Sequence, residues 1–146
     1  ISSHALKPEK VPYLQTDITN REALLKAVSS LKPAVIVHTA ADTDVDGCER
    51  NPRQAFSVNV EGTKHVAEAA DSCDAALVFI SSDYVFDGRK TTPYLESDQP
   101  NPLNVYGRSK LEGEKEIMKR CPRSLIFRLI IYTGVTSYVN FSKIKI

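Results

Sequence analysis

The sequence predicts an α/β fold, in which a doubly wound parallel sheet is built from strands that alternate with helices. Short, continuous apolar runs rich in β-branched residues recur along the chain, and segments with apolar residues at helical spacing lie between them. Continuous apolarity is typical of strands that are covered on both faces. The order β-α-β-α-β-loop-α-β implies parallel strands joined by right-handed crossovers.

Four strands are expected. The clearest apolar runs are Val35–Val37, Leu77–Ile80 and Leu125–Ile131, the last of which contains one charged residue, Arg128. A weaker run at Val11–Gln15 predicts a further strand near the start of the chain. Because these runs are short, none is long enough to span a bilayer, and we expect no membrane partner.

Three helices are expected between the strands. Asn20 can cap the first, which carries apolar residues at helical spacing and is stopped by Pro33. Pro52 suits the first turn of the second, whose apolar pattern continues to Ala69. The third runs from about Leu103 to Arg120. The polar connection between residues 83 and 102 is too long for a simple turn, which indicates a functional loop.

Composition excludes several classes of partner. The chain has 146 residues, of which 42% are hydrophobic, and 19 Lys+Arg balance 18 Asp+Glu. This is enough for one compact domain. With no dense basic run, nucleic acid is not an expected partner. The chain has no signal-peptide pattern, and its cysteines are odd in number and widely spaced, which favours a reducing cytosol over a disulfide framework or zinc site.

Several other acidic residues and histidines could be functional, but a structural role explains each of them more simply. Asp44, Asp46 and Glu49 could suggest a metal site, but a helix-start or loop charge cluster is the preferred interpretation, and no metal is predicted. His38, within a strand, is expected to be buried and hydrogen-bonded. His65 is expected on a helix surface.

Tyr106 and Lys110 are the first candidates for chemistry. They are four residues apart in a predicted helix, which places a phenol and an ammonium on one helix face. Alone, this pair is a common surface arrangement. The apolar strand upstream, however, ends in two hydroxyls, Ser81 and Ser82, and the segment Ala40–Thr43 also follows a strand. Ligands of open parallel sheets bind beyond these carboxyl ends, so the sequence predicts a site there.

Four segments resemble the extended short-chain dehydrogenase/reductase family, and within it the dTDP-4-dehydrorhamnose reductase branch. The first, Ala40–Asp46 with Glu49, is similar to the segment after the family's fourth strand, and Val58–Thr63 is similar to its helix asparagine motif. Ser81–Gly88 matches its Ser-(Ser/Thr)-Asp-Tyr-Val-Phe-Asp-Gly string. Pro100–Glu114 matches its Pro-x-Pro-x-x-x-Tyr-Gly-x-Ser-Lys-x-x-Gly-Glu string.

The resemblance covers about residues 17–128 and implies a partial Rossmann-like fold, an NADPH or NADH cofactor and a nucleotide-sugar substrate. Tyr106 would donate the proton, Lys110 would bind the nicotinamide ribose, Ser82 would hydrogen-bond the substrate carbonyl, and Asp83 would lie by the sugar. The implied cofactor-binding residues are Asp17 and Ile18 at the adenine, with Ala40, Ala41, Thr43 and Asn59 along the dinucleotide, beside Tyr106 and Lys110.

The residue types suit carbonyl reduction. Hydride delivered to a ketone carbon leaves a developing alkoxide, which needs a proton and hydrogen-bond donors. A free phenol has a pKa near 10. We therefore expect the Lys110 ammonium to favour the phenolate of Tyr106 and to bring its pKa closer to neutrality.

The sequence also departs from the family. Only six glycines occur, and none forms the Gly-rich pyrophosphate loop that joins the family's first strand to its first helix. The chain, which starts at Ile1, is therefore expected to be a fragment. It would be an incomplete NAD(P)-binding domain over residues 1–146, with 1–10 and 132–146 irregular, lacking the first βαβ part and the substrate domain. By itself it is expected to be poorly stable, to bind dinucleotide weakly and to be inactive.

Two functions remain open at this point. One is NAD(P)H-dependent reduction of a nucleotide-linked 4-keto-6-deoxy sugar. The other is a non-catalytic regulatory β subunit of methionine adenosyltransferase, which resembles the same branch. The Thr43-x-Val45-Asp46 segment favours the reductase, and Ser82 in place of Thr slightly favours the subunit. The partner is accordingly a second copy in a homodimer or a methionine adenosyltransferase catalytic subunit, in the cytoplasm.

Overall fold

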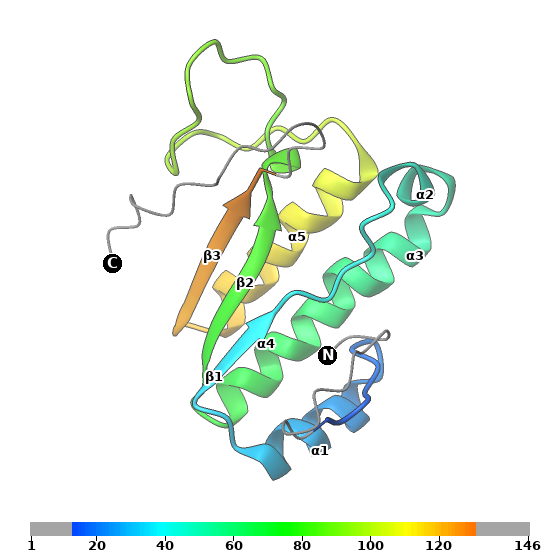
Figure 1. Cartoon of the computed structure of the whole chain (residues 1–146), viewed down its shortest axis with the longest axis vertical. Helices are drawn as coiled ribbons and strands as arrows, with labels where there is room; N and C mark the ends of the chain where they lie inside the picture. Colours follow the sequence, from blue (N-terminus) through cyan, green and yellow to red (C-terminus); the bar gives the residue numbers. More distant parts are fainter. Residues whose placement is uncertain (1–12, 131–146) are drawn as a thin grey trace.

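The computed structural model describes residues 13–130, and within them a parallel sheet carries the fold (Figure 1). Its strands are β1 (Val35–His38), β2 (Ala76–Ser82) and β3 (Ser124–Leu129), in the order β1-β2-β3. Val37 lies opposite Val78, which in turn lies opposite Leu125. The predicted α/β class with a parallel sheet is confirmed.

The strand predicted at residues 11–15 is wrong where it can be judged. Residues 13–15 form no strand. Residues 11 and 12 lie outside the described part, as do both ends predicted to be irregular, residues 1–10 and 132–146. A strand persists only where a neighbour satisfies its backbone groups. Among the described strands, β1 is the one nearest in sequence to residues 13–15. It is an edge strand that pairs only with β2, so residues 13–15 have no partner strand there.

The helices follow local signals closely. Asn20 caps α1 (Arg21–Leu31) by accepting a hydrogen bond from the amide of Ala23, at 3.1 Å. Lys32, in the left-handed region at φ 45°, ends that helix just before Pro33. Asn104 caps α5 (Val105–Arg120) in the same way. The other helical elements are α2 (Val45–Arg50), α3 (Pro52–Phe56), the π-helix η1 (Ser57–Gly62), α4 (Thr63–Ser72) and the 3-10 helix η2 (Asp83–Val85).

The second predicted helix starts at Pro52 as expected, but it is not uniformly α-helical. The π-helix η1 interrupts it, which places Asn59 at a widened turn between α3 and α4. Such π segments are frequent at functional sites. The short α2 before it was not expected; Asp44 caps it, so the acidic cluster does mark a helix start.

Helices α4 and α5 pack against one face of the sheet (Figure 1). The buried side chains of α1, α4 and α5 and the inward residues of the strands form the main core, in which Leu24, Leu77, Phe79 and Ile117 are almost fully buried. The opposite face is bare within residues 13–130: Val35 and Val37 are 53% and 57% exposed, and Leu125 is 49% exposed. Only one of the two helical layers of a doubly wound sheet is therefore present in this part of the chain.

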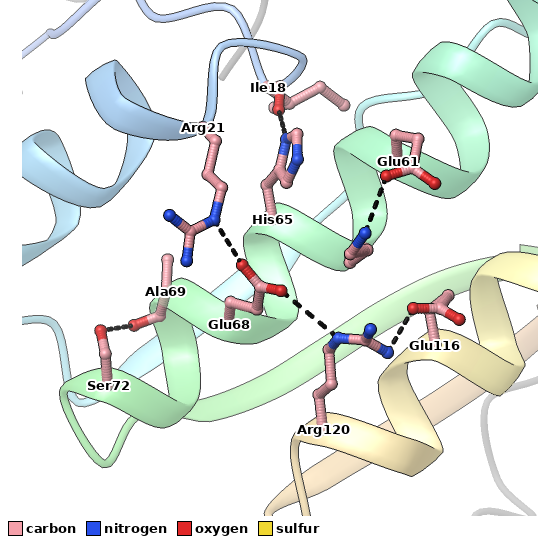
Figure 2. A network of polar contacts seen from close by, with 10 residues as sticks. Ile18, Arg21, Glu61, His65, Glu68, Ala69, Ser72, Glu116 and Arg120 are labelled. Carbon is pink, nitrogen blue, oxygen red and sulfur yellow. Dashed lines mark hydrogen bonds and ion pairs between the residues drawn. The ribbon is translucent and has the colours of Figure 1, made fainter.

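Charged side chains join the three long helices on the outer surface of that layer (Figure 2). Glu68 on α4 accepts hydrogen bonds from Arg21 of α1, at 2.8 Å, and from Arg120 of α5, at 3.4 Å. Nearby, the Nδ1 of His65 lies 3.0 Å from the carbonyl oxygen of Ile18. His65 is half-buried and holds the segment before α1 on α4, so its expected role as an ordinary surface residue is wrong.

Candidate active site at the carboxyl end of the sheet

Helix α5 begins beside the end of β2, and its first turn is fixed by side chains from two other segments. The amide of Gly107 donates to Asn104, at 2.7 Å, and the amide of Val105 donates to the Oε1 of Glu49, at 2.5 Å. A helix N-terminus leaves such amides without partners inside the helix. Glu49 thus links α2 to the start of α5 and gives the acidic cluster a structural role.

Gly107 allows α5 to approach the loop that follows β2. A Cβ at this position would lie 2.1 Å from the carbonyl oxygen of Tyr84. The ring of Tyr84 packs edge-on against the ring of Tyr106, with centroids 5.6 Å apart. The tyrosine of α5 is therefore held closely against the η2 turn.

Lys110 is buried, with only 3% of its surface exposed. Its Nζ donates to the carbonyl oxygen of Ile80 at 2.8 Å and lies 4.1 Å from the centre of the Phe79 ring. Burial lowers the pKa of Lys110 to about 8, and the nearby Glu114 carboxylate opposes this shift. At neutral pH the group is still largely an ammonium, placed at the carboxyl end of β2.

Tyr106 is also buried, at 7% exposed. Burial raises its pKa, because the phenolate is poorly solvated there, and the neighbouring Ser82 side chain acts in the opposite direction. The expectation that the ammonium lowers the pKa of this phenol is therefore wrong for this structure. The reason is geometric: the Lys110 ammonium is directed at a β2 carbonyl.

Ser82 ends β2 and is 3% exposed. Its hydroxyl oxygen accepts a hydrogen bond from the amide of Tyr84 and donates one to the Oδ1 of Asp83, each at 3.2 Å. Asp83 itself is half-buried. The structure thus brings Ser82, Asp83 and Tyr106 together where β2 ends.

The long loop after Asp83 is held together from within. Asp87 accepts hydrogen bonds from the hydroxyl of Tyr94 at 2.7 Å and from the side chain of Asn101 at 3.0 Å. These contacts lower the pKa of the Asp87 carboxyl to about 2. The ring of Tyr94 stacks on Phe86 with centroids 4.3 Å apart. The predicted functional loop is a folded unit that starts at the candidate site.

The segment after β1 is fixed by Asn59. Its Oδ1 accepts from the amide of Asp42 at 2.8 Å, while its Nδ2 donates to the carbonyl oxygen of Asp42 at 3.0 Å and to the Oγ of Ser109 at 2.9 Å. Asn59 is 1% exposed. The side chain of this predicted cofactor-binding residue is therefore fully engaged in shaping the Ala40–Thr43 loop.

The other predicted cofactor-binding residues lie in two separate segments, one after β1 and one before α1. Ala40 and Ala41 are half-buried and Thr43 is exposed, all beyond the carboxyl end of β1 as predicted. Asp17 is exposed and accepts two hydrogen bonds from Thr19, each at 2.8 Å. The Ile18 side chain points into the core near Gly62 and is 6% exposed.

Glu114 and Arg128 were missed as site residues. Charges of both signs alternate along residues 110–116, which is typical of an exposed helix face, yet Glu114 is 1% exposed. Its carboxylate accepts from Ser81 at 2.5 Å and from the Nη2 of Arg128 at 2.7 Å. The spacing of four from Lys110, and a single Arg in an apolar strand, were the available signals.

The prediction of a buried, hydrogen-bonded His38 is confirmed. His38 is 4% exposed, and its Nε2 lies 3.0 Å from the Oγ1 of Thr63. Burial and the Lys110 ammonium lower the pKa of His38 to about 3, so the ring is neutral. The three cysteines are buried or half-buried and carry free thiols. Within residues 13–130, no cluster of potential ligands could hold a metal ion, and no helix could cross a membrane.

Comparisons with known proteins agree with the motifs. A family model described as the RmlD substrate binding domain matches residues 2–143. The chain is 40% identical over 134 residues to methionine adenosyltransferase 2 subunit beta of Danio rerio, covering 92% of this chain and 41% of that protein. It is 44% identical over 116 residues to dTDP-4-dehydrorhamnose reductase of Aggregatibacter actinomycetemcomitans, covering 80% and 40%.

A solved structure shares the fold. The dTDP-4-dehydrorhamnose reductase of Bacillus anthracis, in complex with NADP, matches with a TM-score of 0.78 at 37% identity, over 79% of this chain and 41% of that one. These matches confirm the resemblance drawn from the motifs. The chain spans about two fifths of the length of the curated relatives it matches.

Proposed function

Because the chain belongs to the RmlD substrate binding domain family, we propose that it carries the carbonyl-reducing half of an NAD(P)H-dependent reductase for a nucleotide-linked 4-keto-6-deoxy sugar. One observation carries the proposal. Helix α5 buries Tyr106 and Lys110 against the end of β2, where Ser82 and Asp83 lie. Related proteins named dTDP-4-dehydrorhamnose reductase support this substrate class.

Each of these residues has a separate role in the proposed reduction. A bound reduced nicotinamide supplies the hydride to the ketone carbon. The Tyr106 hydroxyl gives its proton to the carbonyl oxygen as negative charge develops there, and the Ser82 hydroxyl donates a hydrogen bond to the same oxygen. Lys110 would hold the nicotinamide ribose, and its ammonium would balance the Tyr106 phenolate that remains.

The described residues fit one half of the dinucleotide. A buried cation and the clamped loop beyond β1 suit the nicotinamide and ribose side, where Lys110, Tyr106 and Ala40–Thr43 would lie, and Asn59 would act by holding that loop. The pyrophosphate side is not matched. The glycines in the described part lie in α2, η1, the long loop and α5, and none opens a helix after a strand.

We infer that residues 1–146 belong to one incomplete dinucleotide-binding domain, which is inactive alone. Asp17 and Ile18 would meet the adenine, although the Ile18 side chain is committed to the core. Isothermal titration of NADPH into the 146-residue chain should show weak or no binding. An affinity of roughly micromolar or tighter would contradict this.

The decisive assay uses the full-length protein that carries this sequence. It should oxidise NADPH in the presence of dTDP-4-dehydrorhamnose, and Tyr106→Phe should abolish turnover because the proton donor is lost. The circular dichroism spectrum and the NADPH affinity of this variant should match those of the wild type. Turnover that survives in Tyr106→Phe would refute the assigned role, and NADH as a second donor resolves the cofactor preference.

A second function is favoured by one finding. The 40% identity to a methionine adenosyltransferase 2 subunit beta covers 92% of the chain. Under this alternative the protein is a cytoplasmic regulatory subunit, and its partner is a methionine adenosyltransferase catalytic subunit rather than a second copy. Co-purification with that enzyme, together with absence of NADPH-dependent turnover, would select this function over the reductase.

A further inference from the structure

Three side chains of α5 engage the last three residues of β2. Tyr106, Lys110 and Glu114 follow one another at intervals of four, on one helix face. Lys110 donates to the carbonyl oxygen of Ile80, at 2.8 Å, and Glu114 accepts from the Oγ of Ser81, at 2.5 Å. The remaining residue, Ser82, faces Tyr106.

The third member of this row carries a buried charge. Glu114 is 1% exposed, and the guanidinium of Arg128 on β3 binds it through two nitrogens, Nη2 to Oε2 at 2.7 Å and Nε to Oε1 at 3.0 Å. Removing a carboxylate from water is costly unless it is paired and hydrogen-bonded. Glu114 meets this condition with partners from both β2 and β3.

Arg128 extends the same network to the loop. Its guanidinium carbon lies 5.0 Å from the centre of the Phe86 ring, and Phe86 stacks on Tyr94. The Asp87 hydrogen bonds then hold that part of the loop. The orientation of Arg128, and with it this contact, is set by Glu114 through a bidentate pair.

We propose that Glu114 is a positioning residue of the carbonyl-reducing site, which fixes the end of β2 and the Arg128–Phe86 contact of the following loop relative to Tyr106 and Lys110. The inference rests on the proposed function for its kinetic consequences. It adds a residue to that function. In this role Glu114 touches neither the substrate nor the cofactor and acts through Ser81, Arg128 and Lys110.

The test compares variants of the full-length protein. Glu114→Gln keeps the shape and removes the charge, and Glu114→Asp keeps the charge but withdraws the carboxylate. Ser81→Ala removes one hydrogen bond with little change in volume. Glu112→Gln is the matched control, because Glu112 lies on the same helix in an exposed pair with Lys115.

Two readouts separate positioning from simple stabilisation. We expect Glu114→Gln to lower kcat by roughly tenfold to a hundredfold with a smaller change in KM, and Ser81→Ala to lower kcat less. An NMR titration of the Lys110 side chain should show a lower pKa in Glu114→Gln than in the wild type and in Glu112→Gln. The other titratable groups near this ammonium are His38 on β1, Tyr106 on the same helix face and the Glu114–Arg128 pair, and His38 stays neutral.

Unchanged kcat and an unchanged Lys110 titration in folded Glu114→Gln would overturn the proposal. So would a loss of rate that only follows the unfolded fraction measured by circular dichroism. If Glu114→Gln does not fold, Ser81→Ala and Glu114→Asp decide, since wild-type kcat in both would refute positioning. If the wild type itself has no reductase activity, the proposed function fails, and the Lys110 titration still decides the role of Glu114.

Discussion

Lys110 makes the stability of this protein depend on pH above neutrality. Burial lowers its pKa from 10.5 to about 8. Below about pH 8 the lysine is protonated in both states, and the folded state bears the full cost of a buried charge. As the pH rises toward 10.5, the folded state loses its proton first, so stability should rise. Since one pKa unit corresponds to about 1.4 kcal/mol, the complete effect is about 3 kcal/mol, and about 2 kcal/mol of it falls between roughly pH 7 and 9.5.

Urea unfolding followed by far-UV circular dichroism measures this effect. The reference is Lys110→Met, which keeps a flexible apolar stem and cannot titrate. The difference in unfolding free energy, wild type minus Lys110→Met, should increase by about 2 kcal/mol over that interval. Other groups that titrate there, such as the tyrosines, cancel in the difference. Parallel pH profiles for the two proteins would show that the lysine is not desolvated as its contacts with Ile80 and Phe79 require.

Two further substitutions test the packing around the site. Gly107→Ala would place a Cβ 2.1 Å from the Tyr84 carbonyl oxygen, and we expect it to lower the unfolding free energy by about 2 kcal/mol despite the better helix propensity of alanine. Gly88→Ala is the comparison: no atom lies within 4 Å of the added Cβ, but φ is 69°, so the unfolding free energy should fall by only about 1 kcal/mol. Equal losses in the two variants would refute the close approach of α5 to Tyr84. His38, whose pKa is lowered to about 3, stays neutral when folded, so stability should fall by ~1.5 kcal/mol between about pH 6.5 and 5 as the unfolded state takes up the proton. His38→Gln should abolish that slope in urea titrations, and a slope that persists would assign it to another group.

Local sequence signals were sufficient for most of the architecture. Asn20 and Pro52 act on their own helix starts, and continuous apolar runs form β1, β2 and β3, because a helix cap and the apolar composition of a strand are local properties of the chain. The strand predicted at residues 11–15 was wrong, because a strand needs more than a local signal. Residues 13–15 have a strand-like composition but no strand, since pairing depends on a partner that composition does not supply.

The sequence by itself determined part of the candidate site: a helix that carries Tyr106 and Lys110 four apart, following a strand that ends in Ser82. The tertiary structure decided their electrostatics. It directed Lys110 at a β2 carbonyl, raised the pKa of Tyr106 through burial, and buried Glu114 between Ser81 and Arg128 in a stretch whose alternating charges suggested solvent. Burial and long-range pairing belong to the packed sheet and helices together, and no spacing within one segment encodes them.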